Sequence, residues 1–155
     1  MYIPKHYTPK ELFPPEIASP VNGSFDPRNW RLYDDRILKG FDEIRENHGK
    51  MTGNEKGLTE CGLRIGKFSL SQHYWGRAID THPKKTTCFE IRKSIIINRI
   101  KYKYITFLEI DIKGKNSGKP WLHGDCRNNG GELQLWSPTR GFVSHADYLA
   151  WGDKF

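Results

Sequence analysis

The sequence predicts an α+β fold in which a small antiparallel sheet is flanked by helices. Residues 26–49 carry apolar side chains at helical spacing, and residues 104–112 alternate between two sets of side chains as a strand does. Residues 121–127 follow a segment rich in glycine, asparagine and serine, which indicates a strand returning antiparallel to the first. Because these patterns follow one another without a repeat or a linker, we expect a single domain over residues 1–155.

The first half of the chain contains two helix starts. Thr8 and Glu11 make a capping box that predicts a short helix, and residues 14–25 are interpreted as a loop. Asp26 as N-cap then predicts one helix that ends at Gly49. Its apolar stripe is assigned to the core and consists of Trp30, Tyr33, Ile37, Phe41 and Ile44.

The second half alternates further helices and strands. Thr87 and Glu90 form another capping box, which opens a helix running to about Arg99. The strand at 104–112 places Glu109 and Asp111 opposite its apolar face. The other expected elements are a strand at 63–65, a turn at 113–119, a strand at 132–136 and a C-terminal helix capped by Ser144 and Asp147.

The composition excludes several classes of protein. With 155 residues, 36% hydrophobic and 13% aromatic, the chain can bury a core, so intrinsic disorder is not expected. The longest aliphatic run, residues 95–97, is far too short for a membrane-spanning helix, and residues 1–6 do not resemble a signal peptide. The three cysteines fit neither a zinc ribbon nor a redox motif and are interpreted as buried thiols: Cys61, Cys88 and Cys126.

The net charge of +7 is concentrated in the second half of the chain. Between Lys84 and Lys103, seven basic side chains accompany a single acid, Glu90. This pattern is compatible with an anionic partner, which could be a nucleic acid, a membrane surface or an acidic cell-wall polymer, and equally with a solvated helix face.

Residues 71–80 concentrate the side chains that suggest chemistry. His73 and Asp80 are seven residues apart, a spacing that neither a straight strand nor a helix brings onto one ion. Gly76 permits a bend between them, after which an imidazole nitrogen and a carboxylate oxygen can converge on a metal. His123 is the expected third ligand, and it shares a strand face with Asp125.

The pattern Ser-x-His-x-x-Gly-x-Ala-x-Asp at 71–80, followed by Trp-x-His at 121–123, resembles the M15 zinc peptidases. These are the D-alanyl-D-alanine carboxypeptidases and the phage endolysins that cut peptidoglycan stem peptides. The resemblance implies a hedgehog/DD-peptidase fold in which His73, Asp80 and His123 bind Zn²⁺. It further implies that Ser71 helps to orient the site or the substrate, and that Arg64 contacts the substrate or stabilises the transition state.

The chain departs from the family at the general base. Many relatives have a glutamate three residues before the second histidine, where this chain has Pro120. Another arrangement has a histidine two residues before it, where this chain has Trp121. The base therefore has to be identified from physical arguments.

Three carboxylates are candidates for the base. Asp125 is preferred because it lies on the face of His123, Glu109 comes next, and Asp111 third. If Arg127 pairs with Asp125, then Asp125 is structural and Glu109 becomes the better candidate. If none serves, the domain binds zinc without catalysis.

The leading hypothesis is a zinc-dependent peptidase that hydrolyses peptide bonds in bacterial peptidoglycan stem peptides, either as a D,D-carboxypeptidase or as an endolysin-type endopeptidase. The alternatives are a catalytically silent metal-binding domain of the same fold and, ranked low, a basic nucleic-acid-binding protein, because an interleaved aromatic platform is missing. We expect a monomer acting at the bacterial cell wall, with the stem peptide as substrate, an anionic wall polymer as a further partner and a phage as one conceivable source.

Overall fold

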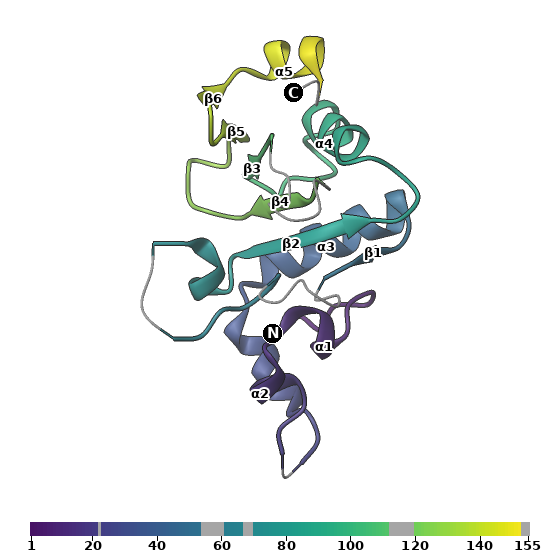
Figure 1. Ribbon diagram of the computed structural model, residues 1–155, viewed down its shortest axis with the longest axis vertical. Helices are drawn as coiled ribbons and strands as arrows, with labels where there is room; N and C mark the ends of the chain where they lie inside the picture. The colour runs from purple at the N-terminus through teal and green to yellow at the C-terminus, as the bar shows by residue number, and fades with distance from the viewer. Residues whose placement is uncertain (22, 54–60, 67–69, 112–119, 153–155) are drawn as a thin grey trace.

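A computed structural model describes residues 1–21, 23–53, 61–66, 70–111 and 120–152. Six strands form one sheet in the order β1-β2-β4-β3-β5-β6, with helices packed around it, so the α+β prediction is confirmed (Figure 1). All neighbours are antiparallel except β3 and β5, which are parallel and make the sheet mixed. The strands are β1 (Met51–Thr52), β2 (Ala78–Pro83), β3 (Phe107–Glu109), β4 (Leu122–Asp125), β5 (Gln134–Ser137) and β6 (Gly141–Val143).

The helix starts that the sequence indicates are confirmed. Both capping boxes form, at Thr8 and at Thr87, and the Ser144 hydroxyl accepts from the backbone N–H of Asp147. The helices are α1 (Pro9–Leu12), α2 (Pro15–Ala18), η1 (Pro27–Leu32), α3 (Asp35–His48), η2 (Gln72–Trp75), α4 (Cys88–Ile97) and α5 (His145–Trp151), where η marks a 3₁₀ helix.

The helix predicted from Asp26 to Gly49 is two helices. The backbone is extended at Tyr33 and Asp34, and the Asp34 carboxylate caps a new start by accepting from the N–H of Arg36. The N–H of Asp34 itself donates to Gly76 (2.9 Å), so a contact from a distant segment stabilises the break. The five stripe residues are nevertheless all buried, as expected. The loop predicted at 14–25 is wrong in part, because α2 lies within it.

Two strand predictions are also corrected. The strand expected at 104–112 is ordered as β3 only from Phe107 to Glu109, and Asp111 has φ +60°, in the left-handed region, which ends the alternation. Residues 63–65 form no strand: the N–H of Leu63 donates to the carbonyl of Leu12. The turn predicted at 113–119 lies outside the described residues.

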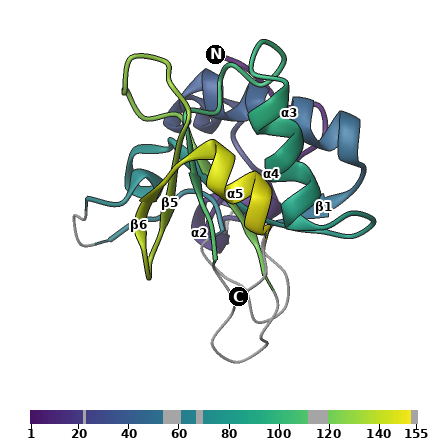
Figure 2. The ribbon, with the colours of Figure 1, turned by 90° about the horizontal axis from the view of Figure 1, so that it is seen from above.

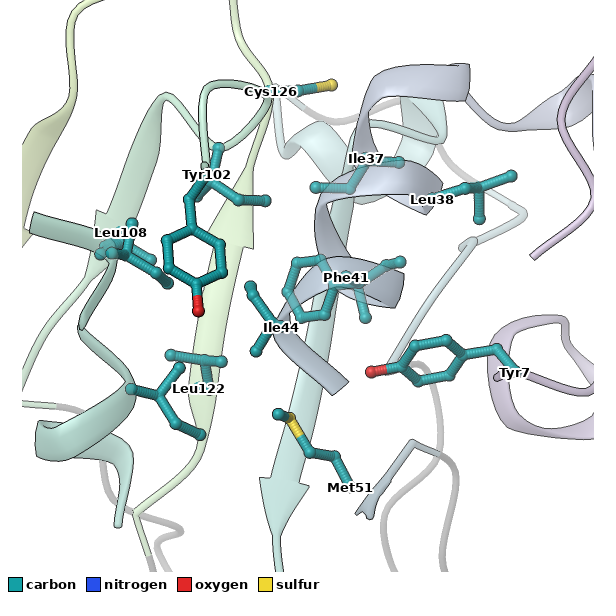
Figure 3. Packing of buried hydrophobic residues seen from close by; sticks show 14 of the residues in the cluster. Tyr7, Ile37, Leu38, Phe41, Ile44, Met51, Tyr102, Leu108, Leu122 and Cys126 are labelled. Carbon is teal, nitrogen blue, oxygen red and sulfur yellow. The ribbon is translucent and has the colours of Figure 1, made fainter. Parts of the chain in front are cut away.

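One face of the sheet packs against α3 and carries the core. In Figure 3, Ile37 and Phe41 of α3 point toward the strands, with Leu108 and Leu122 among the side chains opposite. A Cβ at Gly124 would lie 3.2 Å from the ring of Phe41, so the small residue lets the helix approach β4 closely. The three cysteines are buried thiols, as predicted. Within the described residues, no helix has the length and apolar character that a membrane crossing requires.

Candidate metal centre

His73 lies on η2, directly before the bend that the sequence predicts. Gly76 ends η2 in the left-handed conformation, with φ +61° and ψ 29°. A Cβ at position 76 would overlap the carbonyl oxygen of Leu32, so both the backbone conformation and the space favour glycine here. The chain then enters β2, and the buried ring of His73 faces the side chain of Asp80.

Sheet pairing brings the other two residues of the group together. Asp80 on β2 is the register partner of His123 on β4, and register partners of an antiparallel pair share a face. His123 Nδ1 lies 2.7 Å from Asp80 Oδ1, and His73 Nε2 lies 3.3 Å from Asp80 Oδ2. One possible ligand atom from each of the three side chains lies within 4.8 Å of the others, so the three predicted ligands form a group that could hold a metal ion.

Each imidazole has a partner on the nitrogen that points away from Asp80. His73 Nδ1 lies 2.8 Å from the carbonyl oxygen of Gly62, which makes this nitrogen the donor and leaves Nε2 as the ligand atom. His123 Nε2 lies 3.6 Å from Asp125 Oδ2, which leaves Nδ1 as its ligand atom. Such partners fix the tautomer and the orientation of metal-binding histidines. The donor set and its supporting contacts therefore fit a metal ion.

Asp80 and His123 shift each other's pKa. Burial alone would raise the pKa of Asp80, but the neighbouring imidazoles outweigh it and hold that pKa far below its usual range. Burial alone would lower the pKa of His123, but the carboxylates of Asp80 and Asp125 raise it to about 10. In the absence of a metal, His123 is thus protonated at neutral pH, and metal binding has to displace that proton.

Arg127 pairs with Asp125, which is the condition under which Asp125 is expected to be structural and not the general base. The Asp125 side chain is fully buried and accepts from Arg127 through the backbone N–H (3.1 Å), Nε (2.9 Å) and the terminal NH2 group. Burial alone would raise the pKa of Asp125, but hydrogen bonds from His123 and Arg127 lower it. Arg127 also stacks over the ring of Phe107, 3.4 Å from its centroid. A carboxylate held in this way orients His123 and is poorly placed to exchange protons with a substrate.

Glu109 lies beside His123, on the neighbouring strand. It is the register partner of His123 on β3, so both side chains lie on the same face, opposite the core. Glu109 and His123 line one open cavity of about 310 Å³, together with Ser71 and Gln72. Burial raises the pKa of Glu109, as does the charge of Asp80. Asp111, the third candidate, lies beyond the end of β3.

Arg64 also lies beside the group. Its guanidinium is 3.6 Å from Asp80 Oδ2 and partly exposed. Arg64 also lines a second cavity, of about 460 Å³, between residues 63–65 and the first two helices. It is therefore placed to reach both the candidate metal site and a ligand outside it.

Seven of the eight candidate site residues thus lie in or beside the His73–Asp80–His123 group, and the exception is Asp111. The prediction did not include two aromatic side chains that line the cavity beside Glu109, namely Trp136 and Phe142. Their position beside Glu109 depends on strand order, for which the sequence pattern contains no signal. No family model, curated protein or solved structure matches the chain.

Proposed function

We propose that the protein is a zinc-dependent peptidase that hydrolyses peptide bonds of bacterial peptidoglycan stem peptides. The observation that carries the proposal is the His73–Asp80–His123 group beside a cavity that also holds the carboxyl group of Glu109. Two imidazoles and one carboxylate are a ligand set of catalytic zinc sites, which leave a fourth position for water or substrate. The M15-like pattern at 71–80 adds the substrate class.

The residues around the group have separable roles in this mechanism. Zinc, when bound, polarises the scissile carbonyl and lowers the pKa of water. The carboxylate of Glu109 accepts a proton from the attacking water and returns it to the leaving amine, and its raised pKa favours the second transfer. The guanidinium of Arg64 stabilises negative charge on the carbonyl oxygen or holds a substrate carboxylate. Asp125 keeps the ring of His123 in place.

The basic segment contributes to binding an anionic wall polymer only in part. Arg92 is buried and donates to the carbonyl oxygen of Trp121 (2.8 Å), so its charge supports β4 from inside. The five lysines between residues 84 and 103 are exposed and carry the positive charge that an anionic wall polymer could contact.

The test combines metal analysis with activity on purified sacculi. We expect about one zinc per chain, and a release of new amino termini that stops with chelator and returns with zinc. Glu109→Gln keeps its zinc and loses about 100-fold or more in turnover, the usual contribution of a general base. Glu132→Gln, at an exposed position outside the cavity, is the matched control and retains activity.

Two outcomes contradict this proposal. Stoichiometric zinc without release of amino termini from any wall type would favour a catalytically silent metal-binding domain. Failure of the wild type to bind zinc would mean that the three side chains form a buried ion-pair network instead.

A further inference from the structure

The row of side chains that begins at the candidate metal site continues to the edge of the sheet. Trp136 on β5 is the register partner of Glu109, and Phe142 on β6 is the register partner of Trp136. Because register partners lie on the same face, the two aromatic side chains extend the line formed by Asp80, His123 and Glu109. In Figure 2, β5 and β6 lie on one side of the molecule, while α3 and α4 lie on the other.

These aromatic side chains form one wall of the cavity that contains Glu109 and His123. Phe142 is 70% exposed and Leu70, at the same cavity, is 88% exposed. Exposed apolar side chains that gather at a cavity indicate a ligand with an apolar face. Trp136 is half-buried beside them. His123, one of the three candidate ligands, lines this cavity together with Glu109, so an occupant would lie beside the candidate metal site.

The lining of the cavity also has a polar part. It contains the side chains of Ser71 and Gln72, at the start of the helix that carries His73. A ligand that suits this lining therefore combines an apolar face with hydrogen-bonding groups.

We propose that this cavity binds an N-acetylated sugar ring of the glycan strand to which the stem peptide is attached, an inference that rests on the proposed function. A pyranose ring has a face of C–H groups that packs flat on aromatic side chains, here Trp136 and Phe142. Its hydroxyl and acetamido groups project from the edge and match the polar side chains of Ser71 and Gln72, which line the same cavity. A purely aliphatic or purely charged peptide side chain would match only the aromatic part or only the polar part of the cavity lining.

The position of the wall also restricts which bond is cut. Trp136 and Phe142 lie one and two strands away from Glu109, which corresponds to about 5–10 Å. Extended peptide spans about 3.3 Å per residue, so about two or three residues separate the ring from the carboxylate. The geometry therefore favours an endopeptidase that cuts close to the glycan over a carboxypeptidase that removes the last residue of the stem.

The test is calorimetric titration of the full chain with the β-1,4-linked tetramer of N-acetylglucosamine, in the presence of chelator. We expect saturable binding by the wild type, weakened about tenfold by Trp136→Ala and by Phe142→Ala, as loss of one aromatic contact predicts. Phe142 is largely exposed, so its variant folds even if the half-buried Trp136 variant does not. Trp136→Phe keeps an aromatic face and binds within about twofold of the wild type.

The control is Trp151→Ala, which removes an exposed tryptophan of α5 that does not line the cavity and leaves binding unchanged. Absence of saturable binding, or wild-type binding by both alanine variants, overturns the sugar site. Because no hydrolysis is measured, the two proposals fail separately. Sugar binding by a protein that does not cut sacculi would refute only the peptidase. Cutting by a protein that does not bind the tetramer would refute only the sugar site.

Discussion

Replacement of Asp125 by asparagine distinguishes two roles of this residue, namely orientation of the metal ligand His123 and proton transfer to or from the substrate. The Asp125 carboxylate is buried, accepts from Arg127 and lies 3.6 Å from Nε2 of His123. Asparagine keeps the shape but removes the charge that holds the ring. Loss of such a partner costs about 10–100-fold in metal affinity, or about 1.4–2.8 kcal/mol. We therefore expect weaker zinc binding in competition with a chromophoric chelator, and near-normal turnover once the variant is saturated with zinc.

The chain contains a matched control for this variant. Asp26 and Arg28 form the same Asp-x-Arg pair as Asp125 and Arg127, with the same backbone and Nε contacts, but at an exposed turn away from the site. Asp26→Asn removes an equivalent ion pair and leaves zinc affinity unchanged. If Asp125→Asn binds zinc as tightly as the wild type while turnover falls about 100-fold or more, Asp125 is the general base and the role given to Glu109 is refuted.

Three further outcomes follow from the charges and the backbone. The pKa of His123 is raised to about 10 in the folded chain, whereas the usual pKa of histidine is near 6.5. Without metal, the free energy of unfolding is therefore highest below pH 6.5 and falls by up to about 1.4 kcal/mol per pH unit as the pH rises toward 10. Chemical denaturation from pH 6 to 10 measures this slope, which His123→Gln removes. Zinc binding at pH 7.5 releases about one proton, seen as a dependence of the calorimetric enthalpy on buffer, and binding without release would contradict the protonation assigned to His123. Gly76→Ala lowers the free energy of unfolding by about 1–3 kcal/mol and weakens zinc binding. Gly130→Ala, with φ +75° but open space around it, has the backbone strain alone and keeps the zinc affinity, so equal losses of affinity in both variants would refute the role of the close contact at Leu32.

Local signals predicted the parts of the fold that depend on neighbouring residues. Capping boxes at Thr8 and Thr87 involve residues only three positions apart, and both form as predicted. The apolar stripe from Trp30 to Ile44 was assigned correctly to the core because burial depends on which face is apolar. The break at Asp34 was missed because it is stabilised by the carbonyl of Gly76, which only the folded chain brings near.

The first two candidate ligands, His73 and Asp80, belong to the same class of local prediction. The bend between His73 and Asp80 needs a residue that tolerates a positive φ, and Gly76 is visible in the sequence as such a residue. The third ligand required only that the strand containing His123 pairs with the strand containing Asp80. The partners of the imidazoles could not be predicted, because the carbonyl of Gly62 is not marked by any residue type.

The identity of the base depends on register, which no motif in this chain encodes. Glu109 faces His123 because β3 and β4 pair as they do, with Leu108 opposite Gly124 on the core side. A slip of one residue would place Leu108 beside His123 and turn the carboxylate of Glu109 into the core opposite Leu122, an arrangement that costs several kcal/mol. The packing of Phe41 on Gly124 therefore maintains the register that presents Glu109 to the candidate metal site. A larger side chain at position 124 would test this link, because it would displace Phe41 and disturb the position of Glu109 without touching any proposed ligand.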